Sequence, residues 1–233
     1  MKLPNKTTER KLFKQGYEYI VAVDEVGMGC LAGPVVVCAV LVDRNFISQN
    51  RKKLLGLKES KLLNKKQREK FSRELKKLNI KYKICLAHPQ TIDRLNIYGA
   101  ARQAMKRSVN LVSGSCRDFF PGAQKTARQG ALSRATPQPR FMILVDGKTK
   151  IKGLKLEQTA IIKGDRKVFS IACASIIAKV FRDNMMERYS KKYPGYGFEK
   201  HMGYGTKYHL ARLKIQGPSA IHRKSFEPVT KLI

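Results

Sequence analysis

The chain has 233 residues, enough for one well-buried domain, and it carries 48 Lys and Arg against 17 Asp and Glu. The formal net charge of +31 is far larger than solubility requires and indicates a polyanionic partner, of which nucleic acid is the commonest. An apolar fraction of 42% argues against a wholly disordered chain. No run approaches 18 apolar residues, so a membrane span is excluded and no membrane partner is expected.

The cysteines indicate a reducing compartment. They stand at positions 30, 38, 85, 116 and 173, an odd number without a CxxC pair. This pattern favours buried free thiols over a disulfide framework or a metal site. The first residues also lack the apolar stretch of a secretory signal. We therefore expect a cytoplasmic protein.

The first elements in chain order are a polar, basic segment and a pair of strands. Residues 1–16 are interpreted as a short N-terminal arm or first helix. The apolar runs at 19–23 and 35–42 predict two buried strands, and a glycine-rich turn connects them. Because this connection is short, we expect the two strands to pair antiparallel.

A lysine-rich segment follows, in which residues 51–83 hold 14 Lys and Arg against three Glu. Asn64 and Gln67 have the spacing of a capping box, which predicts the start of a surface helix. Residues 82–86 favour a further strand, and small side chains repeating through 97–111 favour a helix that packs closely on the sheet. The lysines are interpreted as a solvated helix face or, alternatively, as a nucleic-acid contact.

Residues 113–140 break this pattern, with three Gly, three Pro and no Ile or Val. We interpret them as a flexible insertion in a single domain that spans residues 1–233. An apolar run at 141–145 and a long helix from Ser170 resume the order, and the basic residues 184–233 favour a helical C-terminal segment. Strands alternating with helices after an opening hairpin predict an α/β fold, a mixed sheet flanked by helices.

Four acids have positions that suggest chemistry in so basic a chain. Asp24 and Glu25 end one buried strand, Asp146 ends another, and Asp165 precedes the long helix. Because functional groups converge at the carboxyl ends of central strands, we expect these side chains to lie together. Oxygen ligands alone favour Mg²⁺ or Mn²⁺, and a pair of such ions suits hydrolysis of phosphodiesters. For each acid taken alone, a role as turn former or helix cap is the alternative.

The residues around the first acids resemble a family motif. Asp24 to Pro34, read DEVGMGCLAGP, is similar to the opening signature of ribonuclease HII, the type 2 ribonuclease H family. The similarity covers roughly residues 17–112 and 141–228, in further motifs at Glu59 to Leu62, Leu144 to Gly147, Ile162 to Asp165, Ser170 to Asp183, Gly203 to Thr206 and His222 to Phe226. Several ordered motifs of this length make the resemblance specific.

The resemblance implies a ribonuclease H-like fold and a metal-dependent endonuclease. The implied substrates are RNA–DNA hybrids, cut in the RNA strand, and duplex DNA with embedded ribonucleotides, incised on their 5′ side as in ribonucleotide excision repair. A water activated by Mg²⁺ or Mn²⁺ would attack the scissile phosphate in line, leaving 5′-phosphate and 3′-hydroxyl ends. We expect the protein to act as a monomer.

The resemblance also implies roles for individual residues. The catalytic, metal-binding carboxylates, with a two-metal site implied, map onto Asp24, Glu25, Asp146 and Asp165. The glycine turn and the tyrosine that read the RNA–DNA junction map onto Gly27, Met28, Gly29 and Tyr204. Phosphate contacts are expected from Ser60, Lys61 and Lys179. Backbone groups in a glycine turn can approach the 2′-OH closely, because no Cβ intervenes.

Three positions depart from the family pattern. Met28 stands where the family has Arg, Glu59 replaces an Asp, and Lys148 replaces the Asn of Asp-Gly-Asn. Met28 lacks the charge for a phosphate contact, and Lys148 adds positive charge beside the expected metals. These departures leave two alternatives, a catalytically impaired nucleic-acid-binding homologue and a hybrid nuclease like ribonuclease HIII. The latter family carries an extra N-terminal domain, for which the 23 residues before Asp24 leave no space.

Other polar residues are given structural interpretations. Asp183 is interpreted as a surface or capping acid of the long helix, and His201 and His209 as members of a basic face. His222 is interpreted as a structural residue or a phosphate contact rather than a catalytic base.

Overall fold

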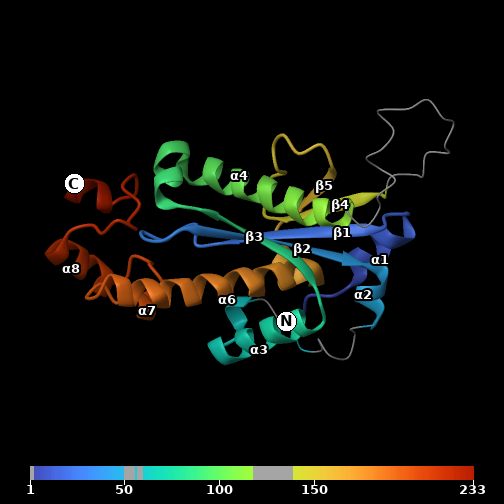
Figure 1. The fold of residues 1–233 in the computed structure, drawn as a ribbon, viewed down its shortest axis with the longest axis horizontal. Coiled ribbons are helices and arrows are strands. Elements are labelled where there is room, and N and C mark those ends of the chain that lie inside the picture. Colours follow the sequence, from blue (N-terminus) through green and yellow to red (C-terminus); the bar gives the residue numbers. More distant parts are fainter. Residues whose placement is uncertain (1–2, 50–55, 57–59, 118–138) are drawn as a thin grey trace.

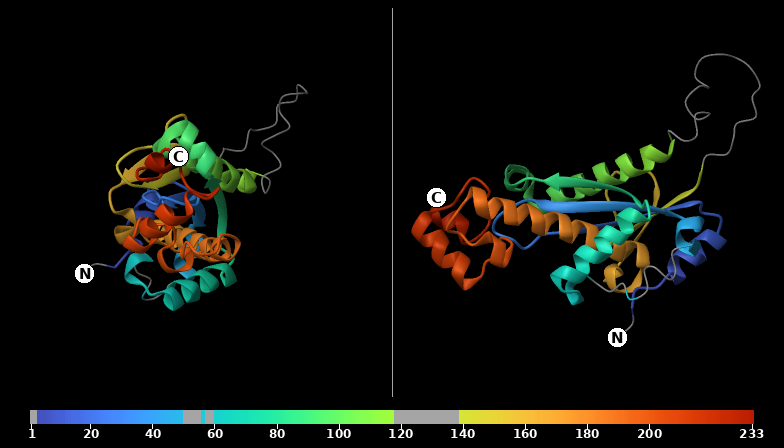
Figure 2. Two further views of the ribbon diagram at one scale, coloured as in Figure 1. Left: turned by 90° about the vertical axis from the view of Figure 1, so that its left-hand side faces the viewer. Right: turned by 60° about the horizontal axis from the view of Figure 1, so that its bottom comes forward.

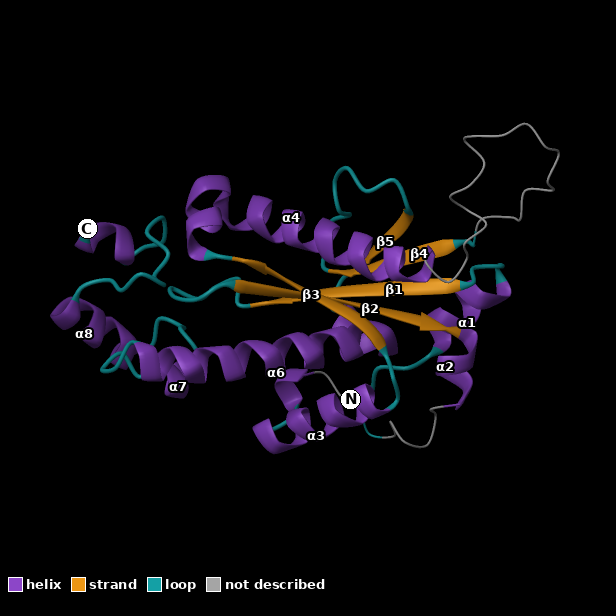
Figure 3. Cartoon of the chain, in the orientation of Figure 1, coloured by secondary structure: helices purple, strands orange, loops and turns teal. Residues whose placement is uncertain are grey.

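The computed structural model describes residues 3–49, 56, 60–117 and 139–233. A five-stranded sheet with helices on both faces forms the centre of the fold (Figures 1 and 3). In the order β3-β2-β1-β4-β5, the strands are β3 Lys81–Ala87, β2 Val35–Asp43, β1 Tyr19–Val26, β4 Phe141–Asp146 and β5 Glu157–Ile161. β2 is antiparallel to β1 and β3, whereas β4 is parallel to β1 and β5. The opening hairpin and the mixed sheet are therefore confirmed.

The helices are α1 Thr7–Lys14, α2 Arg44–Gln49, α3 Lys65–Lys77, α4 Pro89–Arg117, α5 Gly164–Lys167, α6 Phe169–Lys192, α7 Phe198–His201 and α8 Lys207–Gln216, with short 3₁₀ helices at Ser60–Leu62 and Val229–Leu232. α4 covers one face of the sheet, and α6 covers the other with α3 beside it (Figure 1). α7 and α8 form a C-terminal segment at the far end of α6 (Figure 2). None of the helices in the described part of the chain is both long and apolar enough to cross a membrane.

Two hydrophobic cores lie on the two faces of the sheet. Ile20 packs in the core on the α6 side, and its neighbour Val21 packs in the core on the α4 side. β1 and β2 are thus buried on both faces, which explains their unbroken apolar runs. Because side chains alternate along a strand, Asp24 continues the α6 side of β1 and Glu25 the α4 side.

Local signals in the sequence set the starts of two helical segments. The Asn64 side chain accepts a hydrogen bond from the Gln67 amide, and the Gln67 side chain accepts one from the Asn64 amide, which confirms the capping box of α3. The helix predicted over 97–111 is the second part of α4. Asn96, with a φ of 59°, interrupts α4, and its side chain accepts a hydrogen bond from the Gly99 amide at 2.9 Å.

The predicted arm and insertion are described in part. Residues 1–16 contain α1, and residues 113–117 continue α4. Residues 118–138, the bulk of the predicted insertion, lie outside the described residues. The single-domain boundaries and the flexibility of the insertion stay predictions.

Candidate active site

The four acids singled out in the sequence lie together where β1 and β4 end. These strands are parallel neighbours with Val23 opposite Val145, so Asp24 and Asp146 occupy adjacent positions one step further along. The charge of Asp24 interacts with those of Glu25, Asp146 and Asp165. The structure thus brings the four carboxyl groups to one place, and their catalytic and metal-binding roles stay predictions.

Burial and mutual repulsion make these carboxyl groups hard to ionise. Burial, followed by the charges of Glu25 and Asp146, raises the pKa of Asp24 well above its usual range. Burial, followed by the charge of Asp146, raises the pKa of Glu25 to about 7, while the nearby charge of Lys61 acts in the opposite direction. Like charges gathered in this way favour the binding of a cation.

A close approach between α5 and β4 orients Asp146. The amide of Gly164 donates a hydrogen bond to the Asp146 carboxylate at 2.6 Å. A Cβ at position 164 would lie 3.1 Å from that oxygen and 2.6 Å from the Ile171 side chain. Only glycine fits this contact without displacing a neighbour, so Gly164 sets the separation between the two acid-bearing segments.

Serine hydroxyls support Asp24 from the α6 side. The Ser175 side chain forms a hydrogen bond with Asp24, and the Ser60 hydroxyl lies 2.9 Å from that of Ser175. Ser60 is buried, and its hydroxyl supports Asp24 through the contact with Ser175. Its predicted phosphate contact stays a prediction. Sequence reasoning missed Ser175, because a serine among the small side chains of a packed helix gives no separate signal.

The lysine predicted to bind phosphate on α6 has an acidic partner. The Lys179 ammonium lies 2.8 Å from the Asp183 carboxylate, which also lies 3.6 Å from the Arg68 guanidinium. Asp183 is only 5% exposed, so its interpretation as a surface acid was wrong. A buried carboxylate in a basic chain requires cationic neighbours, and a sequence cannot reveal that α3 supplies one of them.

The carboxylate oxygens of this cluster are the type of ligand that a hard divalent cation prefers. Glu25 Oε2 is buried and has no hydrogen-bond partner in the described part of the chain. Such an atom is costly to leave unpaired, and a cation would satisfy it. Within the described ranges, no three His, Cys, Asp or Glu side chains are arranged closely enough to enclose an ion. The carboxylates would therefore have to draw together on binding one.

The loop expected to read the substrate pairs with the segment that carries the expected tyrosine. Cys30 faces Tyr204 in an antiparallel bridge, and the Leu31 amide donates to the Gly203 carbonyl at 2.8 Å. Tyr204 is 43% exposed. The loop 27–29 and Tyr204 therefore form one surface beside the acids, although they are far apart in the sequence.

A cavity of about 330 Å³ opens beside the acids on the α4 side of the sheet. Glu25 and Asp146 line it together with Met28, Arg102 and Lys148. Met28 also packs against the core on that side, so its side chain has an apolar environment. Lys148 lies next to the acid cluster, as its position after Asp146-Gly147 suggested.

Similarity to known proteins shows the family to which this chain belongs. The sequence profile of Ribonuclease HII matches residues 21–229. The chain belongs to the ribonuclease HII family. A ribonuclease HII from Caldicellulosiruptor saccharolyticus is 42% identical over 218 residues, which cover 94% of this chain and 91% of that protein. Family membership makes the protein a ribonuclease H type 2 endonuclease that acts on RNA–DNA hybrids.

Solved structures of ribonucleases H have the same fold. The ribonuclease H2 from Pyrococcus horikoshii superimposes with a TM-score of 0.67 and 26% identity, covering 92% of this chain and 96% of that one. A ribonuclease HIII, Bst-RNase HIII in complex with Mn²⁺, gives a TM-score of 0.63 at 19% identity, covering 94% of this chain and 70% of that one. The predicted ribonuclease H-like fold is confirmed.

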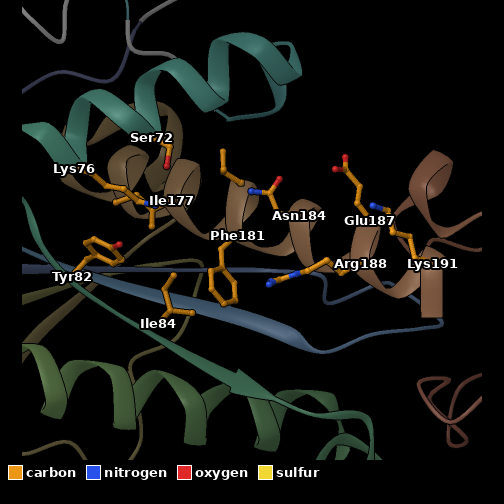
Figure 4. Close-up of a pocket in the computed structure, with 11 residues that line it drawn as sticks. Ser72, Lys76, Tyr82, Ile84, Ile177, Phe181, Asn184, Glu187, Arg188 and Lys191 are labelled. Carbon is orange, nitrogen blue, oxygen red and sulfur yellow. The ribbon is translucent and has the colours of Figure 1, made fainter. Parts of the chain in front are cut away.

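A second cavity, of about 600 Å³, lies between α3, α6 and β3 (Figure 4). Ile177, Phe181 and Asn184 of α6 line it. Ser175 of the same helix is not among its lining residues and forms a hydrogen bond with Asp24 instead. Its acid, Glu187, is paired with Lys65. Glu187 is the one acid among the residues that line this cavity, so the acids at the strand ends stay the candidate site.

Other residues of the C-terminal segment are more buried than the sequence suggested. His209 is fully buried and His201 is 8% exposed, so their placement on a basic face was wrong. His222 is buried too, in agreement with a structural role. The three rings pack against one another and against Phe198.

The cysteines in the described part of the chain agree with the expectation of free thiols. Cys30, Cys38, Cys85 and Cys173 are free and buried. Burial raises the pKa of Cys38 and Cys173 well above the usual range, which keeps their thiols protonated and unreactive. The side chain of Cys116 lies outside the described residues.

Proposed function

We propose that this protein is a metal-dependent endoribonuclease that also incises duplex DNA 5′ to single embedded ribonucleotides. The observation that carries the proposal is the gathering of four carboxyl groups at the ends of β1 and β4, beside the loop 27–29 and Tyr204. The net charge of +31 would attract the polyanionic substrate. The four acids provide an anionic place where ions for catalysis would bind.

Asp24, Glu25, Asp146 and Asp165 would hold Mg²⁺ or Mn²⁺, with two ions at the site. When bound, such ions activate water for in-line attack and stabilise the leaving oxygen. The unpaired Oε2 of Glu25 supports this role, because it is a buried oxygen ligand in need of a partner. The structurally similar Bst-RNase HIII has been solved in complex with Mn²⁺.

Selection of the ribonucleotide would depend on the loop and the tyrosine. The backbone of residues 27–29 can approach the 2′-OH, which distinguishes RNA from DNA. The exposed ring of Tyr204 lies on the same surface and would stack on the following deoxynucleotide. Lys61, exposed beside Glu25, and Lys179 would contact phosphates on either side of the cut.

One observation favours a second candidate, a catalytically impaired binding protein. Lys148 lines the same cavity as Glu25 and Asp146, which adds a positive charge where a cation would bind. All four acids are retained, which favours the active enzyme. The ribonuclease HIII alternative is replaced by the family assignment to ribonuclease HII.

We further propose a cytoplasmic monomer that takes part in the repair of ribonucleotide-containing DNA. The support for this location is the set of four buried free thiols, which suit a reducing compartment.

The deciding experiment is incision of labelled duplex DNA that carries one ribonucleotide, with Mg²⁺ or Mn²⁺ as the metal. We expect a single cut on the 5′ side of the ribonucleotide, leaving a 3′-hydroxyl, and no cut in an all-DNA duplex. Asp24→Asn should lower the rate by a factor of about 10³ or more, since it removes a charged metal ligand. Asp43→Asn is the matched control, because Asp43 ends β2 at the opposite end of the sheet. Binding without incision would support the impaired homologue instead.

A further inference from the structure

Two arginines are completely buried next to the substrate-reading loop. Arg182 of α6 and Arg223 of the C-terminal segment are both 0% exposed. In the described part of the chain, the hydrogen bonds of both guanidinium groups go to main-chain carbonyls and neither group forms an ion pair. Burying a charge without an ion-pair partner costs free energy, so packing alone does not explain the burial of these two arginines.

The guanidinium of Arg223 binds the carbonyls of the loop itself. Its Nη1 donates to the Met28 carbonyl at 2.8 Å, and its Nη2 donates to the Gly27 carbonyl at 2.6 Å. Nη2 and Nε also donate to the Gly33 carbonyl, at 3.0 and 3.1 Å. The planar fork of an arginine suits this set of acceptors, whereas the single ammonium of a lysine does not. One rigid guanidinium group therefore binds carbonyls at both ends of the segment from Gly27 to Gly33.

This arrangement fixes the direction of the peptide groups that face the substrate. In a trans peptide the C=O and the following N–H point in opposite directions. The carbonyls of Gly27 and Met28 point inward to Arg223, so the amides of Met28 and Gly29 point outward. Within the described residues, neither amide donates a hydrogen bond to the protein. They are two preset donors at the surface shared with Tyr204.

Arg182 is buried in the same way but donates hydrogen bonds to other main-chain carbonyls. It donates to the carbonyls of Ala32 at 3.2 Å, Pro34 at 3.1 Å and Met202 at 2.9 Å. It makes no hydrogen bond to the carbonyl of Gly27 or Met28. Arg182 is thus a matched control, because its replacement removes a comparable buried network but none of the hydrogen bonds to the carbonyls of Gly27 and Met28.

We propose that Arg223 is a positioning residue for ribonucleotide recognition, which turns the amides of Met28 and Gly29 toward the substrate as donors to the 2′-oxygen. The inference rests on the proposed function, since it assigns the reading of the 2′-OH to this loop. The selection then comes from the backbone and from a side chain 195 positions away in the sequence. It does not require the arginine that the family carries at position 28.

The test compares Arg223→Lys with Arg182→Lys, both in the Asp24→Asn background so that the substrate is not cut. Fluorescence anisotropy measures the ratio of affinities for a duplex with one ribonucleotide and for the same duplex in all-DNA form. Arg223→Lys should lower this ratio at least tenfold, whereas Arg182→Lys should change it less than twofold. Melting temperatures should fall in both, so a purely structural role would not separate the two variants. An unchanged ratio in Arg223→Lys would overturn the inference.

A measurement on the parent protein covers the case in which Arg223→Lys does not fold. Amide hydrogen exchange of Met28 and Gly29 should be fast in the free protein and slowed at least tenfold by the ribonucleotide-containing duplex, but not by the all-DNA duplex. Equal exchange in both complexes would contradict the positioning role. If the parent enzyme does not incise the ribonucleotide-containing duplex, the proposed function fails; if it incises this duplex and Arg223→Lys keeps the parent ratio of affinities, the inference alone fails.

Discussion

The imidazole rings of His209 and His222 meet Nε2 to Nε2 at 3.0 Å in the interior of the C-terminal segment. The Ser219 amide donates to Nδ1 of His222 at 2.9 Å, so the proton of a neutral His222 is on Nε2. His222 therefore donates to His209, whose Nδ1 donates in turn to the Tyr204 carbonyl at 2.8 Å. This directional chain holds the main chain of the junction tyrosine and requires both rings to be neutral.

Acid should therefore destabilise the folded protein through these histidines. Burial is the main cause that lowers the pKa of both His209 and His222 to about 4, against 6.5 in the unfolded chain. Between pH 6.5 and 4 the unfolded state binds more protons, so the stability that the neutral rings provide is lost as the pH falls through this window. The loss is on the order of 2 kcal/mol for each ring.

The measurement is the melting temperature as a function of pH for the parent and for His222→Gln. The raised pKa values of Asp24 and Glu25 act in the opposite sense, so the informative quantity is the difference between variant and parent. His222→Gln should have a flatter profile between pH 6.5 and 4, and His88→Gln, at an exposed position, should match the parent. Parallel profiles for His222→Gln and the parent would refute this account.

The centre of the fold could be predicted from the sequence because β1, β2 and β4 are buried on both faces. Such strands leave unbroken apolar runs, and the acids that follow them stand out, as Asp24 and Asp146 do. The parallel pairing of β1 and β4 then places the two acids side by side. Alternation along β1 places Asp24 and Glu25 on opposite sides of the sheet, but the sequence does not show which helix covers each side.

Residues whose roles depend on contacts across the fold were interpreted wrongly or missed. His209 stands among lysines and tyrosines in the sequence, so its position resembles a basic face. Its burial depends on Phe198 and His222, which approach it only after the segment has folded. Arg223 stands in the motif from His222 to Phe226, but no local pattern reveals that its charged side chain binds carbonyls of a distant loop.

Alanine substitutions at Gly27 and Gly29 of the loop 27–29 should affect the protein differently. Gly27 has a φ of 99°, and a Cβ there would lie 2.3 Å from Nε of Arg182, so Gly27→Ala should lose about 2 kcal/mol of stability or more. At Gly29 a Cβ would meet nothing within 4 Å, so Gly29→Ala should melt within about 0.5 kcal/mol of the parent. Its methyl group would instead stand between the backbone and the substrate.

Thermal unfolding together with incision kinetics separates these two effects. Gly29→Ala should lower kcat/KM on the ribonucleotide-containing duplex at least tenfold while the melting temperature stays nearly constant. Normal kinetics in a stable Gly29→Ala protein would show that the substrate does not approach the loop at this position.

Removal of one acidic charge should stabilise the protein in the absence of divalent metal. Asp24 is buried among three other acids, so Asp24→Asn relieves repulsion and keeps the shape of the side chain. We expect a gain of about 1 kcal/mol, which corresponds to roughly 2–4 °C in melting temperature for a chain of this size. Calorimetry with EDTA measures the gain.

Millimolar Mg²⁺ should then raise the melting temperature of the parent more than that of the variant, and Asp43→Asn should behave as the parent. Lower stability of Asp24→Asn in EDTA would contradict the repulsion.

An arginine at position 28 should strengthen substrate binding without altering selectivity. The Met28 side chain lines the cavity of about 330 Å³ beside the acids, so a longer side chain can extend into open space. Met28→Arg adds one phosphate contact, which should increase the slope of log affinity against log salt concentration by about 0.9 and lower KM several-fold at low salt. The preference for the ribonucleotide should stay unchanged, because the backbone amides provide it. Met28→Gln has similar length and no charge and should keep the parent slope. An equal slope in the Arg and Gln variants would mean that position 28 does not face a phosphate.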